Sequence, residues 1–502
     1  MAGVTKIKAS FIIAFDGEKH RYLRDGELAF EQDRILYVGQ KYEGPVERTI
    51  NASGKVVSPG FISTHAHLFE SPMDRSFVED KGNPQFYMSG LYEYLPVRGM
   101  AMDDETRSIC LEYSLAELLR SGTTTVVELA PACEEIFEFI PRLGNRVYFG
   151  PLFRSGRWYT PDGRQVLYDW SEDQGFKALE AALEFIRAHE DACDGLLKGV
   201  VSPSQIDTCT PELLQESHKA AKDLKAPFTI HTSQAVIEFN EMLRRHGKTP
   251  IAWLDSLGCL DENTLLGHAI IIGGTSWTNY PAGDLERMRR SGCSVAHAAW
   301  VFARRGVVME SFHKYQAAGV NMTLGTDTSP QNMIQAMRWA AVLSKMVERD
   351  TETTTAADVF NAATLGGARA LGRKDLGRLE PGAKADIVIF AGDSINMVPM
   401  RDPVKNIVYS AEMEDVETVI INGRTVVEGG TVLGADTRKL SGRVQKAGER
   451  LWPRLADYDW AGRGVDALSP LSFEPLNGAP GHGAADAPKV SGEKSGAKTG
   501  TW

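Results

Sequence analysis

The feature that most restricts the fold of this chain is an alternation of short apolar or β-branched runs with longer helical segments, from residue 58 to residue 373. Eight such runs can be counted. They include residues 195–202, and residues 123–129 after an amphipathic segment at 105–120. Pro211 directly after Thr210 marks the start of another helix, because proline is favoured at the first helical position after a capping residue. This rhythm is typical of an α/β protein and predicts a (β/α)8 TIM-like barrel over residues 58–373.

Both ends of the chain have a different, strand-rich texture. Residues 6–15, 26–30 and 34–38 predict strands, and strand character returns in 376–390 and 416–427. We therefore expect a small β-sandwich domain built from residues 1–57 and 374–435. A helical extension is predicted for 436–474. Residues 475–502, rich in Gly, Ala, Pro and Ser, predict a disordered tail.

Composition excludes several classes of function. The net charge of −11 argues against nucleic acid or an anionic membrane surface as a partner. The six cysteines form no C-x-x-C pair, so neither a disulfide framework nor a thiolate metal site is indicated. No export signal or membrane span is visible, and we expect a cytoplasmic protein.

Two histidines follow the first run of the alternating region. His65 and His67 are separated by Ala66, and side chains at positions i and i+2 of a strand point to the same face. They would project together at the end of the strand, which suits a metal site. On this evidence alone, a pair of surface histidines is equally compatible.

Four further residues favour the metal site. His231, His268, His297 and Asp327 all stand at the ends of predicted strands. In a (β/α)8 barrel these ends converge on one mouth, where active sites lie. The remaining histidines lie in helices, loops or the tail and receive no role.

Three motifs resemble the amidohydrolase superfamily. They are the segment from Pro59 to His67, the Leu-Gly-Thr-Asp sequence ending at Asp327, and the Gly-Arg-Leu-Glu-Pro-Gly-Ala-Lys-Ala-Asp sequence ending at Asp386. The resemblance covers about residues 4–430 and is strongest to the branch that holds atrazine chlorohydrolase, guanine deaminase and related aminohydrolases. The segment 71–96 looks closer still to molinate hydrolase and the phenylurea hydrolases.

The resemblance implies one divalent metal ion per chain. Its ligands would be His65, His67, His231 and Asp327, with His268 orienting or deprotonating the water that the metal activates. Three imidazoles and a carboxylate suit zinc best, and cobalt, manganese or iron(II) as alternatives. Some amidohydrolases bridge two metals with a carboxylated lysine on strand four, but Lys198 stands near the start of that strand, away from the predicted mouth.

One position departs from the family pattern. Relatives that deaminate rings usually carry a glutamate three residues after the strand-five histidine, and this chain has Gln234 there. A carboxamide cannot carry a proton at neutral pH, so we expect Gln234 to position substrate. Glu238, one turn further, is interpreted as a solvated helix residue. His297 and Trp300 are predicted to contact substrate, although a structural role for His297 is equally compatible.

The loops at the predicted mouth are rich in aromatic residues and show few cations. These aromatic residues are Phe69, Phe86, Tyr87, Tyr92, Tyr94, Trp158, Tyr159, Trp300 and Phe302. They favour a flat, apolar, uncharged small molecule. The resulting hypothesis is a metal-dependent hydrolase, forming a homo-oligomer, that cleaves the C–N bond of an N-aryl urea, carbamate or thiocarbamate. The alternatives are an aminohydrolase or dechlorinase of a triazine- or purine-like ring, and a non-catalytic binding or assembly protein.

Overall fold

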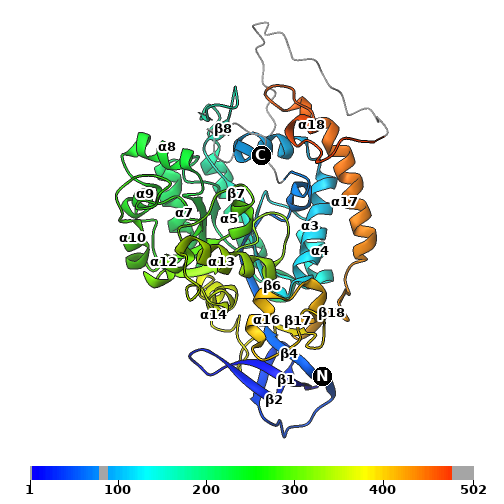
Figure 1. Ribbon diagram of the computed structural model, residues 1–502. Coiled ribbons are helices and arrows are strands. Elements are labelled where there is room, and N and C mark those ends of the chain that lie inside the picture. Colours follow the sequence, from blue (N-terminus) through cyan, green and yellow to red (C-terminus); the bar gives the residue numbers. More distant parts are fainter. Residues whose placement is uncertain (1–2, 78–88, 477–502) are drawn as a thin grey trace.

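The computed structural model describes residues 3–77 and 89–476. The strand-rich chain ends lie at one end of the molecule, beneath a region of parallel strands and helices (Figure 1). The predicted tail, Phe86 and Tyr87 lie outside the described residues, apart from the first two positions of the tail. No helix within the two described ranges is long and apolar enough to cross a membrane.

Parallel strands form the centre of the molecule in two sheets. One sheet has the order β10-β7-β6-β5 with β11 paired to β7, and the other has the order β12-β13-β14-β15. The bounds are β5 Phe61–Ala66, β6 Thr123–Ala130, β7 Arg146–Phe153, β10 Leu197–Gly199, β11 Ser202–Pro203, β12 Phe228–Thr232, β13 Thr264–His268, β14 Ser294–His297 and β15 Asn321–Leu324.

Isolated bridges link the two sheets at both edges. Ala66 pairs with Asp327 on one side, and Val201 pairs with Phe228 and Gln205 with His231 on the other. The predicted α/β class is therefore confirmed, whereas a single continuous eight-stranded ladder is not. The predicted strand 195–202 accounts for much of the difference, because the turn α6 (Ala192–Gly195) takes its first residue and the rest splits into the short strands β10 and β11.

The two chain ends share one mixed sheet of order β19-β18-β17-β16-β4-β1-β2-β3. Strand β16 pairs antiparallel with β4, so segments more than 300 residues apart in sequence lie side by side. The pairing of the two ends is as expected, but the two-layered sandwich remains a prediction. The bounds are β1 Thr5–Phe15, β2 His20–Glu31, β3 Arg34–Gly39, β4 Arg48–Pro59, β16 Ile387–Phe390, β17 Val416–Ile421, β18 Arg424–Glu428 and β19 Thr431–Val432.

Helices surround the parallel strands, and their starts follow capping signals in the sequence. The side chain of Thr210 accepts a hydrogen bond from the backbone N–H of Leu213, and Asp103 caps the helix at 104–120 in the same way. The bounds are α1 Ser89–Tyr92, α2 Tyr94–Ala101, α3 Asp104–Arg120, α4 Ile136–Leu143, α5 Gly175–His189, α7 Pro211–Leu224, α8 Val236–His246, α9 Pro250–Leu257, α10 Asp284–Ser291, α11 Ala299–Ala303, α12 Phe312–Ala317, α13 Met333–Glu348, α14 Ala356–Asn361, α15 Gly367–Ala370, α16 Pro403–Tyr409, α17 Thr437–Leu451 and α18 Val465–Leu468.

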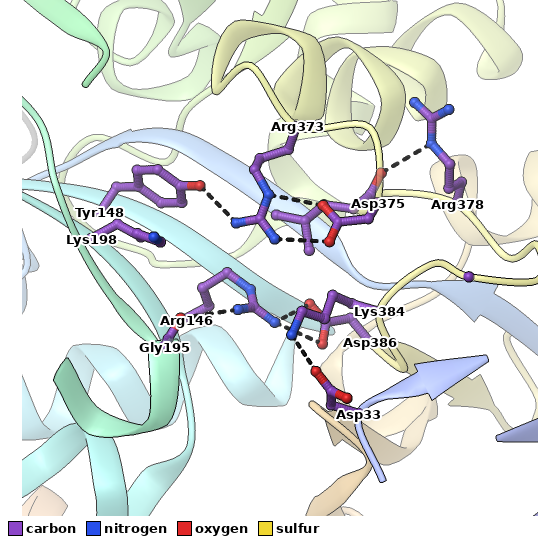
Figure 2. Close-up of polar contacts among 12 residues, drawn as sticks. Asp33, Arg146, Tyr148, Gly195, Lys198, Arg373, Asp375, Arg378, Lys384 and Asp386 are labelled. Carbon is purple, nitrogen blue, oxygen red and sulfur yellow. Dashed lines mark hydrogen bonds and ion pairs between the residues drawn. The ribbon is translucent and has the colours of Figure 1, made fainter. Parts of the chain in front are cut away.

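A polar network fastens the parallel strands to the chain-end sheet (Figure 2). The buried guanidinium of Arg146, at the start of β7, donates to both carboxylate oxygens of Asp386 at 3.2 and 3.1 Å. Arg373 likewise donates to Asp375, and Lys384 pairs with Asp33. Each of these cations has its own carboxylate, so the charges of the network are balanced without a ligand.

The C-terminal extension runs along the outside of the molecule. Helix α17 packs beside α3, where Arg443 donates to Glu112 at 2.6 Å. The chain then continues through a short 3₁₀ segment, Trp452–Asp457, towards α18 (Figure 1). This path returns the extension to the end of the molecule onto which the parallel strands point.

Candidate metal centre and substrate cavity

Four histidines and one aspartate converge at the ends of the parallel strands. The ring of His65 lies with its centroid 4.6 Å from that of His268, 4.7 Å from that of His231 and 5.2 Å from that of His67. The Nε2 atoms of His67 and His231 are 3.0 Å apart. The structure thus brings together four of the five strand-end histidines singled out in the sequence, with Asp327 beside them.

Backbone carbonyls fix the orientation of two of these rings. The Nδ1 atom of His67 lies 2.8 Å from the carbonyl oxygen of Leu129, and that of His231 lies 2.6 Å from the carbonyl of Ser204. When Nδ1 carries the proton and donates it to a carbonyl, Nε2 keeps its lone pair. Both Nε2 lone pairs therefore face the centre of the cluster.

His65 is fully buried, and neither of its ring nitrogens has a hydrogen-bond partner within residues 3–77 and 89–476. A buried imidazole without partners is costly in a protein interior unless it binds something. Burial lowers the pKa of His65 well below its usual value and that of His231 to about 3, so both rings stay neutral. A neutral imidazole is the form that binds a metal ion.

Asp327 completes the cluster because the local backbone turns sharply. Its carboxylate oxygens lie 3.9 Å from the Nε2 atoms of His67 and His268. Its backbone N–H donates to the carbonyl of His65, and its own carbonyl accepts from the N–H of His67, both at 2.9 Å. A Cβ atom on Gly325 would lie 2.7 Å from the Cβ of His65, so only glycine permits this close approach.

The donor set fits a divalent metal ion. The donor atoms of His65, His231 and His268 lie within 4.8 Å of one another, and so do those of His65, His67 and Asp327. The two sets share His65. Imidazole nitrogens with one carboxylate form a borderline site that suits zinc and other first-row ions.

A cavity of about 730 Å³ opens onto this cluster. His67, His231, His268 and Asp327 line it. Its other walls carry many aromatic side chains, namely Phe69, Tyr92, Trp158, Tyr159, Tyr168, Phe302, Tyr458 and Trp460. The space is large enough for a drug-sized organic molecule.

Several residues expected at the cavity are not on its wall. His297 and Trp300 do not line it: the ring of His297 lies near Phe312, and the indole of Trp300 packs on Trp339 with centroids 4.9 Å apart. Their predicted contacts with substrate are therefore not supported. Tyr94 is also absent from the wall because it stacks on Phe77 at 4.3 Å.

The C-terminal extension supplies a wall that sequence reasoning missed. Tyr458 and Trp460 line the cavity from a segment more than 100 residues beyond Asp327. The indole N–H of Trp460 donates to Glu93 at 3.0 Å, and Arg463 donates to the same carboxylate oxygen at 3.0 Å. The only hint in the sequence is the aromatic cluster Tyr-Asp-Trp at 458–460.

The expectation of few cations at the mouth is wrong. Arg107, Arg154, Arg157 and Arg305 all line the cavity. Arg154, Arg157 and Arg305 lie in or next to loops. The sequence of a loop does not reveal the direction in which a long side chain points. Glu70, Asp74, Glu93 and Asp169 line it as well, so the cavity is aromatic and carries charges of both signs.

Gln234 lines the cavity as expected, and its buried amide nitrogen Nε2 has no partner in the part of the chain that the structure describes. Glu238, in contrast, is not a solvated helix residue. Its side chain is fully buried and accepts hydrogen bonds from the backbone N–H groups of Ser233 at 2.5 Å and Gln234 at 3.0 Å. The start of α8 turns inward here, so the carboxylate holds the loop that carries Gln234.

Lys198 lies apart from the histidine cluster. Its amino group pairs with Glu190 at 3.0 Å and Asp191 at 2.5 Å, and it lines a separate cavity with Arg146 and Arg373. It pairs in register with Tyr148, the residue beside it in Figure 2. This position gives no support for a lysine bridge between two metals.

Comparison with known proteins agrees with this geometry. The model of the Amidohydrolase family matches residues 56–426. A 5-methylthioadenosine/S-adenosylhomocysteine deaminase of Pelotomaculum thermopropionicum is 28% identical over 457 residues, covering 89% of this chain and 98% of that protein. The enzyme of the same name from Thermococcus kodakarensis is 30% identical, covering 80% of this chain and 89% of its own.

Solved structures show the same fold. Zinc-bound atrazine chlorohydrolase of Arthrobacter aurescens superposes with a TM-score of 0.77 at 22% identity, covering 88% of this chain and 100% of that one. A zinc-bound adenosine deaminase of Xanthomonas campestris gives a TM-score of 0.76 at 23% identity, covering 89% and 98%.

Proposed function

Because the chain belongs to the amidohydrolase family, we propose that it is a metal-dependent hydrolase that cleaves a C–N bond of a small amide-like compound. The observation that carries this proposal is the cluster of His65 with His67, His231, His268 and Asp327, the last four of which line one cavity. Both ring nitrogens of His65 have no hydrogen-bond partner among the described residues. We assign His65, His67, His231 and Asp327 to one zinc ion. An ion held there would activate water and polarise the bond to be broken.

The residues of the cluster supply the proton transfers. Hydrolysis requires a proton to leave the attacking water and another to reach the leaving nitrogen. Asp327 faces the cavity within 3.9 Å of His268, so the two side chains can accept the first proton and deliver it onwards. Gln234 has no acidic proton to give, and its unpartnered amide nitrogen is free to donate a hydrogen bond to substrate.

This division of roles favours an acyclic substrate such as a urea, carbamate or thiocarbamate. Protonating a ring nitrogen during attack calls for an acid beside the ring, and position 234 carries no such group. Aromatic walls formed by Tyr92, Trp158 and Phe302 would hold an aryl substituent.

A second candidate is the hydrolytic deamination of a purine- or triazine-like ring. It is favoured by the relatives named as nucleoside deaminases, one of which matches this chain over 98% of its own length. Gln234→Glu separates the two candidates. Gain of ring deamination without loss of the metal would place this chain one substitution from that activity.

The test is a substrate screen with zinc-loaded protein. Phenylurea, phenyl carbamate, adenosine and an aminotriazine are offered, and release of aniline or ammonia is measured beside the metal content. We expect hydrolysis of the urea or carbamate with about one ion per chain, and loss of both metal and activity in His65→Ala. Activity that persists in metal-free His65→Ala, or two ions per active chain, would contradict the assignment.

A further inference from the structure

Arg154 is a cation of the substrate cavity that has no partner among the described residues. It follows β7 directly and lines the cavity, yet it forms no hydrogen bond or ion pair with any residue of the described ranges. Arg146, at the opposite end of the same strand, donates to both carboxylate oxygens of Asp386 (Figure 2). One strand thus carries a paired arginine at its start and an unpaired one after its end.

The other cavity arginines of the described ranges are paired or bonded. Arg157 lies 3.5 Å from Asp169 and 3.7 Å from Glu172, and Arg107 lies 3.2 Å from Asp104. Arg305 donates to the carbonyl of Val301 at 3.3 Å. Arg154 differs from all of them because no carboxylate or carbonyl of the described residues accepts a hydrogen bond from it.

An unpaired guanidinium in this position is unfavourable for the free protein. Arginine keeps its proton at any pH that a protein tolerates, so it cannot become neutral on burial. Arg154 is half-buried, and burial together with the nearby charge of Arg157 lowers its pKa. Water in the cavity can hydrate such a group only in part. An anion that accepts its hydrogen bonds would stabilise the charge better.

We propose that Arg154 binds a carboxylate or similar oxyanion of the substrate and so selects anionic substrates. The inference rests on the proposed function, because it names the substrate class of the same cavity: a C–N compound with an aryl body and a carboxylate. The planar fork of the guanidinium can give two parallel hydrogen bonds to a carboxylate, which fixes the orientation of the substrate as well as its charge.

Binding of benzoate tests the proposal without any turnover. Isothermal titration compares zinc-loaded wild type with Arg154→Gln and Arg154→Lys. Because all three keep the metal, any direct binding of benzoate to zinc is common to them. We expect Arg154→Gln to weaken binding about 10- to 100-fold, the range for charge-assisted hydrogen bonds. Arg154→Lys should fall between, and added salt should weaken wild-type binding.

Arg289→Gln is the matched control. It removes one positive charge from α10, where Arg289 is exposed and pairs with Glu286. Its affinity for benzoate should equal that of wild type. Equal affinity of wild type and Arg154→Gln, at equal zinc content, would overturn the proposal.

The melting temperature of the ligand-free protein distinguishes a binding role of Arg154 from a structural role, because the two roles predict shifts of opposite sign. Arg154→Met removes an unpaired charge and should raise the melting temperature of the ligand-free protein, whereas a structural arginine would lower it. A lowered melting temperature would show that Arg154 supports the fold and would overturn the proposal.

Turnover separates this inference from the proposed function. We expect wild type to hydrolyse 4-ureidobenzoate faster than phenylurea at low concentration, with the preference lost in Arg154→Gln through a raised KM. If neither urea is cleaved but benzoate binding depends on Arg154, the urea assignment fails and the anion site stands. If both ureas are cleaved with no preference, the anion site fails and the hydrolase assignment stands.

Discussion

Asp327 combines an unusual backbone with a buried charge. It adopts the left-handed region at φ 57°, which asparagine and aspartate tolerate better than other residues with a Cβ. Asp327→Asn therefore tests the carboxylate and leaves the backbone in place. Asparagine cannot accept the proton of the attacking water, and kcat should fall on the order of 10²-fold or more.

The measurement of Asp327→Asn is a steady-state kcat at a metal content determined in the same sample. Loss of one ligand should also weaken the metal, so excess zinc is supplied to both proteins. An unchanged kcat at full zinc occupancy would remove Asp327 from the acid–base role.

Glu238 gives a second prediction at this scale. Its carboxylate accepts two backbone N–H groups, and an amide in its place would turn an NH₂ group towards one of them. Glu238→Gln should cost about 1–3 kcal/mol of unfolding free energy and raise KM, because the loop of Gln234 loosens. Denaturant unfolding and steady-state kinetics measure the two effects.

Glu241→Gln on the same helix is the matched control. Glu241 pairs with Arg244 and Arg245 near the surface, where an ion pair contributes about 0–1 kcal/mol. Its KM should stay near the wild-type value. If the two substitutions changed the unfolding free energy and KM equally, Glu238 would not stabilise the loop that carries Gln234.

Sequence reasoning found the cluster residues because it needed only their positions at strand ends. Parallel strands place those ends together, and short side chains leave little doubt about where His65 or Asp327 points. Glu238 and Arg154 required knowledge of which way a longer side chain turns. Burial of Glu238 depends on the entry angle of α8, which no local pattern encodes.

At the scale of elements, the C-terminal extension closes the cavity from outside the parallel strands. The side chain of Trp460 lines the cavity, and its indole N–H donates a hydrogen bond to Glu93, the residue between α1 and α2. Trp460→Ala should raise KM several-fold with little change in kcat, because a wall is lost and the reacting groups are not touched. Leu471→Ala, at a side chain 66% exposed in the same extension, should leave KM unchanged.

A kinetic comparison of the two variants decides the role of the extension. If Trp460→Ala lowered kcat at unchanged KM, the extension would act on the chemistry through the position of the metal cluster. Equal kinetics of both variants and wild type would show that the wall does not contact substrate.

Elements with a strong local signal were predicted well. Helix α7 begins at Pro211 after the Thr210 cap, as expected from those two residues. The run 195–202 was not predicted well, since Leu196 and Val200 are as apolar as strand residues while Cys193 and Asp194 adopt positive φ angles in the preceding turn. Apolar composition alone does not distinguish one strand from two short ones.

At the scale of the whole molecule, His20 joins the chain-end sheet to the parallel-strand region. Its Nε2 atom lies 3.1 Å from the hydroxyl of Thr364, and its ring packs on Phe15 and Phe360. Burial, followed by the nearby charge of Arg378, lowers its pKa to about 4 from 6.5. Protonation of His20 therefore disfavours the folded state.

The sign of the pH effect follows from that shift. Above pH 6.5 His20 is neutral in both states and its contribution is fully present. As the pH falls from 6.5 towards 4, the unfolded chain binds a proton that the folded chain resists, and stability is lost by up to about 3 kcal/mol. His20→Gln should lose less stability than wild type between pH 7.5 and pH 5.

Thermal unfolding of wild type and His20→Gln across this range measures the difference. Between pH 7.5 and pH 9 the gap between the two proteins should stay constant, which serves as an internal control. A constant gap down to pH 5 would show that His20 is already open to solvent protons when folded.

The two parallel sheets are joined at two seams, the edges where the isolated bridges pair them, and the metal site lies between these seams. Asp327 and His231 themselves form isolated bridges across opposite seams, to Ala66 and Gln205. An ion held by His65, His67, His231 and Asp327 would therefore cross-link the two sheets at both seams. Stripping it with a chelator should accelerate hydrogen–deuterium exchange at the amides of His67 and Ile206, which cross the seams, more than within β6 or β13. Loading of the ion would then set how firmly the two halves of the molecule are held together, and uniform exchange in both states would show that they cohere without it.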